Sequence, residues 1–387
     1  MKILMLHNRY KIPGGEDVCT HMQVDALRSN GHYVELVEES NEHVDVLGMG
    51  RTAVRTIWSQ ESFSRVEQLL AEKEYDVMHV QNFFPLLSPS VYYAAQRHGV
   101  PVIQALHNFR LLCPEGTLYR DGRVCMDCVG RNVAWPGIKH ACYRGSRAGS
   151  SVVAAMSSTH RLVGTWKNRV DLYVTPSQYA MDAYVQAGWD PKMISVIPNF
   201  VDPDPGLGSG SGGYALYVGR LARAKGIETL LAAWQQLGLN HPLKIAGDGD
   251  LRAVVERAAE EHPSITYLGP VSHQRASELM GEAMFVIVPT VGTETFGLVV
   301  AEALATGTPA LVSDTAALAE LIDEGGNGLL LRPGDSQHLA DSVDWMFTHP
   351  EQLAAMRQSA RATFLSRFTR DRASELWMVA YRSVIDG

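Results

Sequence analysis

The chain has 387 residues, 46% of them hydrophobic, and a formal net charge of −8 at pH 7. This length allows two domains with separate cores, and the acidic balance argues against a generally basic nucleic-acid binder. No uninterrupted apolar stretch approaches the length of a membrane span, and five cysteines in so long a chain do not make a disulfide scaffold. The first residues, MKILMLHNRY, enter a strand directly and lack a signal-peptide cleavage pattern, so we expect a cytoplasmic protein.

The first predicted strand, Lys2–His7, is followed by the glycine pair Gly14 and Gly15 and by a helix from about Glu16 to Ser29. No G-x-G-x-x-G fingerprint is present, which argues against an ordinary dehydrogenase. A glycine pair before a helix permits close backbone approach to a phosphate, and the alternative is a plain tight turn.

Strands and helices then alternate, which indicates right-handed βαβ units, a parallel sheet and an α/β fold. His107 ends the predicted strand Val100–His107, at the carboxyl edge where such sheets bind ligands. A lone histidine is usually structural, but this position favours a functional role. The other strands expected in this half are His32–Glu38, Asp76–Gln81, Leu172–Thr175 and Ile194–Pro198, and the helices lie near Glu61–Lys73, Pro89–Arg97 and Ser177–Ala187.

An insertion at about 108–147 departs from this alternation and holds four cysteines with the spacing C-x11-C-x2-C-x13-C. A close C-x2-C pair with two outlying cysteines is typical of a structural tetrahedral zinc site. The alternatives are a redox pair, which is disfavoured because no helix opens at the motif, or four unrelated thiols. The predicted zinc ligands are Cys113, Cys125, Cys128 and Cys142.

A basic stretch, Arg131–Val170, contains no Asp or Glu in a chain that is acidic overall. Trp135, Tyr143 and Trp166 are interleaved with its cations. This asymmetry indicates contact with anionic lipid or with a phosphate-bearing acceptor, and the alternative is a solvated face. Single-stranded nucleic acid is not supported, because no nucleic-acid module accompanies the stretch. The cations are Arg131, Lys139, Arg144, Arg147, Arg161, Lys167 and Arg169.

The Pro-, Gly- and Ser-rich run Val201–Gly213 predicts a flexible connection between two domains. After it the strand–helix pattern restarts, and the loop GRLARAKG places Arg220 and Lys225 between a strand and a helix. Two cations there can neutralise a diphosphate, whereas the alternative is a pair of ordinary surface cations. Further predicted contacts to the ligand are Gly219, Gly247 and Gly249, where the backbone can approach closely, and Val271, which we expect near a nucleotide base.

The stretch Met284–Asp314 reads as strand, tight loop, helix, turn and strand. Its loop ends at a helix N-terminus on the carboxyl edge of a parallel sheet, where unpaired N–H groups favour anionic ligands. Glu294 in the loop and Glu302 in the helix suit sugar hydroxyls better than phosphates, which points to a nucleotide-sugar. The alternative is two carboxylates on solvated surfaces. The loop and first helical turn add Thr295, Phe296, Gly297, Leu298 and Val299 as predicted donor contacts.

The sequence E-T-F-G-L-V-V-A-E-A-L-A-T-G-T-P resembles the E-x7-E signature of glycosyltransferase family 4, the retaining GT-B enzymes. The loops holding Gly14 and Lys225, and the segment V-I-Q-A-L-H-N, are similar to further motifs of that family. H-N-F-R-L-L-C-P-E-G resembles a subset from bacterial polysaccharide synthesis. The resemblance implies that Glu294 binds hydroxyls of the transferred sugar, that Glu302 binds the ribose, and that His107 donates a hydrogen bond to the sugar.

By this resemblance the chain has two Rossmann-like doubly wound domains that face each other across a cleft. We expect an acceptor domain at 1–200, a nucleotide-sugar domain at 201–370 and a final helix at 371–387 that packs back on the first domain. The implied reaction is transfer with retention, without a metal ion in the chemistry, in polysaccharide or lipid-linked glycan assembly. A nucleotide-sugar epimerase and a non-catalytic nucleotide-sugar-binding protein remain as alternatives.

Overall fold

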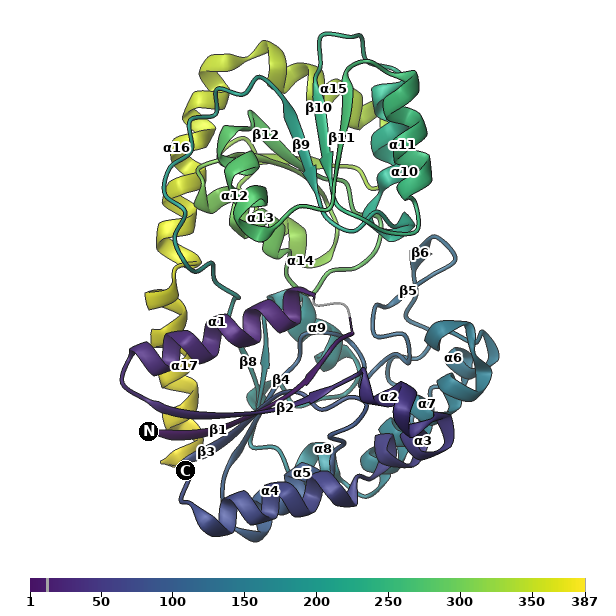
Figure 1. Cartoon of the computed structure of the whole chain (residues 1–387), viewed down its shortest axis with the longest axis vertical. Coiled ribbons are helices and arrows are strands. Elements are labelled where there is room, and N and C mark those ends of the chain that lie inside the picture. Colours follow the sequence, from purple (N-terminus) through teal and green to yellow (C-terminus); the bar gives the residue numbers. More distant parts are fainter. Residues whose placement is uncertain (12–13, 387) are drawn as a thin grey trace. The chain divides into compact units, whose positions relative to one another are not determined.

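A computed structural model describes residues 1–11 and 14–386 of the protein, which form two compact units. The first unit comprises residues 1–118, 125–198 and 373–387, and the second comprises residues 119–124 and 199–372. Each unit contains one six-stranded parallel sheet with helices packed on it (Figure 1). The predicted α/β class with two doubly wound sheets is therefore confirmed.

The sheet of the first unit has the strand order β2-β1-β3-β4-β7-β8, and each neighbouring pair is parallel. The central strands β1, β3 and β4 are almost entirely buried, as expected of parallel strands covered on both faces. The strand bounds are β1 Lys2–Arg9, β2 Tyr33–Ser40, β3 Val77–Asn82, β4 Val102–Ala105, β7 Leu172–Thr175 and β8 Ile194–Val196.

Several helices of this unit were not predicted. The longest of them, α7, begins after Ser146, whose side chain accepts a hydrogen bond from Gly149 N. Its sequence is rich in Ala and Ser, so its apolar periodicity is weak although one face is buried. The predicted helices are α1 Gly15–Ser29, α4 Gln60–Glu72, α5 Ser90–Arg97 and α9 Gln178–Gln186, and the additional ones are α2 His43–Leu47, α3 Met49–Ile57, α6 Trp135–Lys139, α7 Arg147–Leu162 and α8 Thr165–Asn168.

The sheet of the second unit has the order β11-β10-β9-β12-β13-β14. Alternate residues of β9 enter different cores: Ala215 and Tyr217 pack in one apolar cluster, whereas Leu216 packs in another. Both faces of this sheet are thus covered. The strands are β9 Ala215–Val218, β10 Leu243–Ala246, β11 Ile265–Gly269, β12 Phe285–Val288, β13 Ala310–Ser313 and β14 Gly328–Leu331, and the α-helices are α10 Ile227–Trp234, α11 Arg252–Glu261, α12 His273–Glu282, α13 Leu298–Ala305, α14 Ala316–Ala319, α15 Ser336–Thr348 and α16 Pro350–Arg367.

The segment Val201–Gly213, predicted as a flexible connection, instead forms backbone hydrogen bonds with other parts of the second unit. Gly208 N, Gly210 N and Gly212 N donate to the carbonyls of Thr306, Gly281 and Glu282. A Cβ atom on residue 208 would collide with the backbone of Gly281. The glycines of this segment therefore permit close packing of two backbones, and the expectation of flexibility was wrong.

The division into units differs from the expected domains in two respects. The boundary falls after Pro198, and the short hairpin of β5 (Tyr119–Arg120) and β6 (Arg123–Val124) groups with the second unit. The final helix α17 (Arg370–Ile385) begins in the second unit and continues into the first from Ala373 onward. There Tyr381 OH lies 2.7 Å from His79 Nδ1 of β3, and the Trp377 ring packs 4.7 Å from the His79 ring.

Candidate nucleotide-sugar and acceptor sites

The second unit brings two of the predicted loops together. Strands β9 and β12 are neighbours at the point where the strand order reverses, which is where doubly wound sheets bind ligands. The loop after β9 holds Arg220 and Lys225, and the loop after β12 holds Glu294. Val291 N and Gly292 N both donate to Ala224 O, at 2.9 and 3.0 Å, and fix one loop against the other.

Charged side chains meet where these loops join. Lys225 Nζ forms an ion pair with Glu294, and both side chains remain partly exposed to solvent. Arg220 is exposed, and its carbonyl accepts a hydrogen bond of 2.8 Å from Tyr217 OH. Burial and the Glu294 carboxylate raise the pKa of Tyr217, while the Arg220 charge acts in the opposite direction. A cationic pair and a carboxylate therefore share one edge of the sheet, as a sugar diphosphate requires.

The N-terminus of α13 opens beside Glu294. Gly297 caps this helix with φ of +107°, and a Cβ atom there would collide with Leu318. The first N–H groups of a helix have no intrahelical acceptor, so those of Leu298 and Val299 can bind an anion. Phe296 is buried and packs against Phe368, with ring centroids 5.8 Å apart. Only the backbone of Phe296 can therefore serve a ligand, whereas Thr295 is half-buried beside it.

Glu302 has a partner that sequence reasoning missed. Its Oε1 lies 3.0 Å from Nε2 of His273, the first residue of α12, and this hydrogen bond raises the pKa of His273. His273 follows the strand β11 at the carboxyl edge of the sheet, so the rule that selected His107 could also have selected His273. The pair Glu302–His273 lies on the same unit as Lys225, as a ribose-binding carboxylate must.

The glycines predicted to approach a ligand divide into two kinds. Cβ atoms at Gly247 and Gly249 would collide with the carbonyls of Gly219 and Leu221, so these glycines are already required by contact between neighbouring loops. Val271 is half-buried and packs against an apolar cluster of the sheet. Gly14, in the first unit, has an ordinary φ of −123° and no atom within 4 Å of a Cβ position. Packing therefore explains Gly247 and Gly249 but leaves Gly14 open to a ligand.

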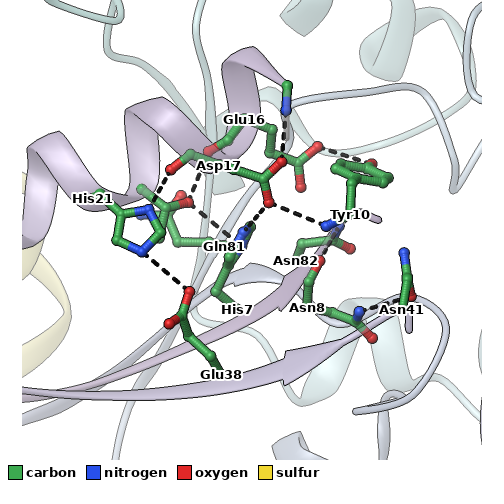
Figure 2. Close-up of polar contacts among 12 residues, drawn as sticks. His7, Asn8, Tyr10, Glu16, Asp17, His21, Glu38, Asn41, Gln81 and Asn82 are labelled. Atoms are coloured by element: carbon green, nitrogen blue, oxygen red, sulfur yellow. Dashed lines mark hydrogen bonds and ion pairs between the residues drawn. The ribbon is translucent and has the colours of Figure 1, made fainter. Parts of the chain in front are cut away.

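In the first unit, the Gly14–Gly15 loop is held by Asp17 at the start of α1 (Figure 2). Asp17 Oδ2 accepts from Gly14 N at 2.8 Å, and Oδ1 lies 2.9 Å from Nε2 of the buried His7. Burial by itself raises the pKa of Asp17, but the hydrogen bonds from His7, Gly14 and Tyr10 outweigh it and lower that pKa. Asp17 therefore stays ionised and holds the backbone N–H groups of Tyr10 and Gly14.

His107 lies two residues beyond the end of β4, and its Nε2 is 2.6 Å from Gln81 Oε1. The Gln81 amide in turn donates to Gln23, so its oxygen faces His107. Burial lowers the pKa of His107 to about 4, with the nearby His7 adding to the effect. A neutral ring that donates through Nε2 presents Nδ1 as an acceptor. The role of His107 toward a sugar therefore stays a prediction, with Nε2 of the ring already bonded to Gln81.

Glu16, which was not among the predicted site residues, has an unusual environment in the structure. Tyr10 OH and Asn108 Nδ2 donate to its Oε2, at 3.1 and 3.3 Å, whereas Oε1 is buried without a hydrogen-bond partner. Burial, as the largest cause, raises the pKa of Glu16 to about 7. This carboxyl group follows the glycine pair directly, beside Asp17.

Of the four cysteines of the insertion, Cys113 and Cys128 are buried and Cys125 and Cys142 are half-buried. Burial raises the pKa of Cys128 to about 11, and the other three thiols act on it electrostatically. Among residues 1–11 and 14–386, no three His, Cys, Asp or Glu side chains are arranged to hold a metal ion. The thiols thus lie near one another without forming a ready tetrahedral site, and structural zinc stays a prediction.

The basic stretch folds into α6, α7, α8 and their connections. Most of its cations are exposed, and exposed apolar side chains, including Trp135, Leu162 and Val163, accompany them. No helix in the described part of the chain is both long and apolar enough to cross a membrane.

Two family models match the chain in succession. Residues 13–205 match Glycosyltransferase Family 4, and residues 208–363 match Glycosyl transferases group 1. An uncharacterized glycosyltransferase of Methanocaldococcus jannaschii is 26% identical over 371 residues, which cover 89% of this chain and 88% of that protein. Glycogen synthase of Mycobacterium tuberculosis is 24% identical over 383 residues, with 92% and 81% covered.

Solved structures share the fold. HepE of Anabaena, in complex with UDP-glucose, superposes with a TM-score of 0.71 and 19% identity over 99% of this chain and all of that one. Sucrose-phosphate synthase of Thermosynechococcus elongatus gives 0.71 and 16% identity, with 100% and 99% covered. With the motifs, the two sheets and both family models in agreement, the chain belongs to the family 4 type of GT-B glycosyltransferases.

Proposed function

We propose that the protein transfers a sugar from a nucleotide-diphosphate-sugar to a hydroxyl group of an acceptor, with retention of anomeric configuration. This proposal rests on the contact between the loops after β9 and β12. There Lys225 forms an ion pair with Glu294 beside the N-terminus of α13. The HepE structures contain UDP or UDP-glucose, which supports a uridine donor.

In the proposed reaction, the chain's own groups compensate charge that develops on the leaving diphosphate. Arg220, Lys225 and the first N–H groups of α13 stabilise the phosphates, and Glu294 accepts hydrogen bonds from the transferred sugar. Lys225 must exchange part of its interaction with Glu294 for the diphosphate, which leaves the Glu294 carboxylate available to hydroxyl groups. The acceptor hydroxyl attacks on the leaving-group face, and the diphosphate takes its proton. No metal ion is needed for this step.

We assign acceptor binding to the first unit. The Gly14 loop, Glu16 and His107 lie at the carboxyl ends of β1 and β4, with Gln81 at the end of β3 between them. A hydroxyl group of the acceptor can donate to the unpartnered Oε1 of Glu16.

A matched pair of variants tests the donor site. Lys225→Ala should lower the transfer rate about 100-fold or more, because it removes the cation opposite the leaving diphosphate. Arg223→Ala, in the same loop but exposed and paired with Glu228, should retain near-normal activity. Turnover assays with UDP-, GDP- and ADP-glucose measure both, and equal rates in the two variants would falsify the assignment.

Product analysis separates transfer from the other two functions. A GT-B epimerase converts donor alone into a changed nucleotide-sugar, and a binding protein gives no product with any acceptor. We expect free nucleotide to appear only when a saccharide or lipid-linked acceptor is present, as in polysaccharide or lipid-linked glycan assembly.

The basic stretch supports a peripheral contact with an anionic membrane, which would place the enzyme at the inner face of the cell membrane. Its exposed cations, including Lys139, Arg147 and Lys167, attract anionic headgroups, and Trp135 is 60% exposed among them. At low salt the protein should co-sediment with vesicles of phosphatidylglycerol, whereas it should not co-sediment with vesicles of phosphatidylcholine.

A further inference from the structure

The first unit holds a cavity of about 430 Å³ that is separate from the predicted site residues. It lies where α8 precedes β7 and where α9 turns into β8. Because the strands are parallel, both connections are at the amino edge of the sheet, opposite the edge at which His107 and the Gly14 loop lie. Its volume is within the range of small-molecule sites.

Trp166 and Trp189 line this cavity, but the Trp166 ring is 6% exposed because Phe83 and Tyr92 pack on it. The Trp166 indole N–H donates to Ser157 O at 3.1 Å, and Tyr173 OH donates to Trp166 O at 2.7 Å. The half-buried Trp189 ring packs edgewise on Tyr173, with ring centroids 4.6 Å apart. The exposed part of the Trp189 ring suits the C–H face of a pyranose, since contact then needs little reordering of the side chain.

Cations line the same cavity. Arg161 and Lys167 contribute, and within the described residues neither forms an ion pair with an acidic side chain. Arg161 Nη1 donates to Arg131 O at 2.9 Å, which fixes the guanidinium group. The carboxylate in the lining, Asp190, already accepts from Lys192 N at 2.9 Å. The cavity therefore has two positive charges against one negative charge.

We propose that this cavity binds a sugar ring that carries an anionic substituent, a carboxylate or a phosphate ester. Trp189 contacts the ring, Arg161 and Lys167 bind the anionic group, and the exposed Asn132 amide and Asp190 contact hydroxyls. The occupant takes no part in the transfer chemistry, because the cavity lies at the other edge of the sheet. It suits an acidic unit of a glycan that is bound through several sugars.

Calorimetric titration of the full chain tests this assignment without any turnover. Glucuronic acid and glucose 6-phosphate should bind, and neutral glucose should bind at least about tenfold more weakly, because it lacks the charge-assisted hydrogen bonds. Saturating UDP should leave both affinities unchanged. Competition between UDP and the acidic sugars would overturn the proposal, because it would place them at the donor site.

A charge-matched pair of variants locates the binding. Lys167 and Lys139 are both exposed and belong to the same basic stretch, but only Lys167 lines the cavity. Lys167→Glu should weaken the binding of both acidic sugars about tenfold or more, whereas Lys139→Glu should change it less than twofold. Equal loss in both variants, or binding that neither affects, would refute the site. Failure of transfer activity would leave this result untouched, since only binding is measured.

Discussion

At the scale of single residues, the hydrogen-bond partners and the burial of a side chain determine its protonation state and the hydrogen bonds that it can still make. His107 lies at the strand end that the sequence indicates, but its Nε2 is hydrogen-bonded to Gln81 Oε1, and burial keeps the ring neutral. Residue identity alone could not predict this hydrogen bond, because Gln81 of β3 contacts the ring and is itself oriented by Gln23 of α1. The local pattern thus located His107, and the fold determined which hydrogen bonds it can make.

Glu16 should make stability depend on pH. Its pKa of about 7 in the folded protein exceeds the ordinary value of 4.5, so the folded state keeps the proton to higher pH than the unfolded chain. The free energy of unfolding therefore falls as pH rises from 4.5 to 7. Glu16→Gln should raise the stability of the first unit by about 1–2 kcal/mol at pH 8 and have little effect at pH 4.

Thermal melting of the Glu16→Gln variant at both pH values measures this effect. Glu74→Gln provides the control, because Glu74 is exposed. A variant less stable than the parent at pH 8 would show that the ionised carboxylate is favourably bound, contrary to this account.

Cys128 should react slowly with alkylating reagents. Burial raises its pKa to about 11, so the thiolate is scarce at pH 8 and its fraction grows as pH rises toward that value. Mass spectrometry after brief alkylation should find Cys125, which is half-buried, modified before Cys128. Preferential modification of Cys128 at pH 8 would contradict the structure.

At the scale of elements, strand–helix alternation in the sequence was enough to predict both sheets. Strands such as β12 are short apolar runs, and α13 is marked by Gly297 at its start. Helices with small side chains, such as α7, were missed because their buried face is not apolar in composition. The Val201–Gly213 segment was misread for a related reason: glycine allows both flexibility and close backbone packing, and only the neighbours distinguish them.

Glycines of the second sheet offer a direct test of close packing. Gly247→Ala should destabilise the second unit by more than about 2 kcal/mol, because the new Cβ collides with Gly219 O at a φ of +146°. Gly238→Ala should have almost no effect, since nothing lies within 4 Å of its Cβ position. Chemical denaturation of both variants measures the difference, and equal midpoints would argue against loop packing as the reason for Gly247.

Helix α17 supports His107 through a chain of buried side chains. Tyr381 OH contacts both His79 and Gln23, and Gln23 accepts from the amide that holds His107. Tyr381→Phe should cost about 1–2 kcal/mol of stability by leaving buried polar groups unpaired, and should lower kcat by disturbing His107. Val379→Ala, at an exposed position of the same helix, should change neither quantity. Lower stability with unchanged kcat would show that the chain of side chains is structural only.

At the scale of the whole molecule, nucleotide should protect one unit selectively. Lys225, Glu294 and α13 all belong to the second unit, so UDP at a hundred times its Kd should stabilise that unit by about 2.7 kcal/mol. Hydrogen–deuterium exchange should show protection in 219–226 and 290–299. Protection confined to the first unit would rule out the second unit as the donor site.

The second unit is inserted between Pro198 and Ala373 of the first, apart from the hairpin of β5 and β6. The ribosome therefore makes nearly all of the first unit, then nearly all of the second, and only afterwards Trp377 and Tyr381. Until those last residues emerge, His79 and Gln23 lack the aromatic helix that covers them. The first unit therefore stays incomplete until helix α17 has been made. A premature stop codon between Pro198 and Trp377 leaves this unit without that helix.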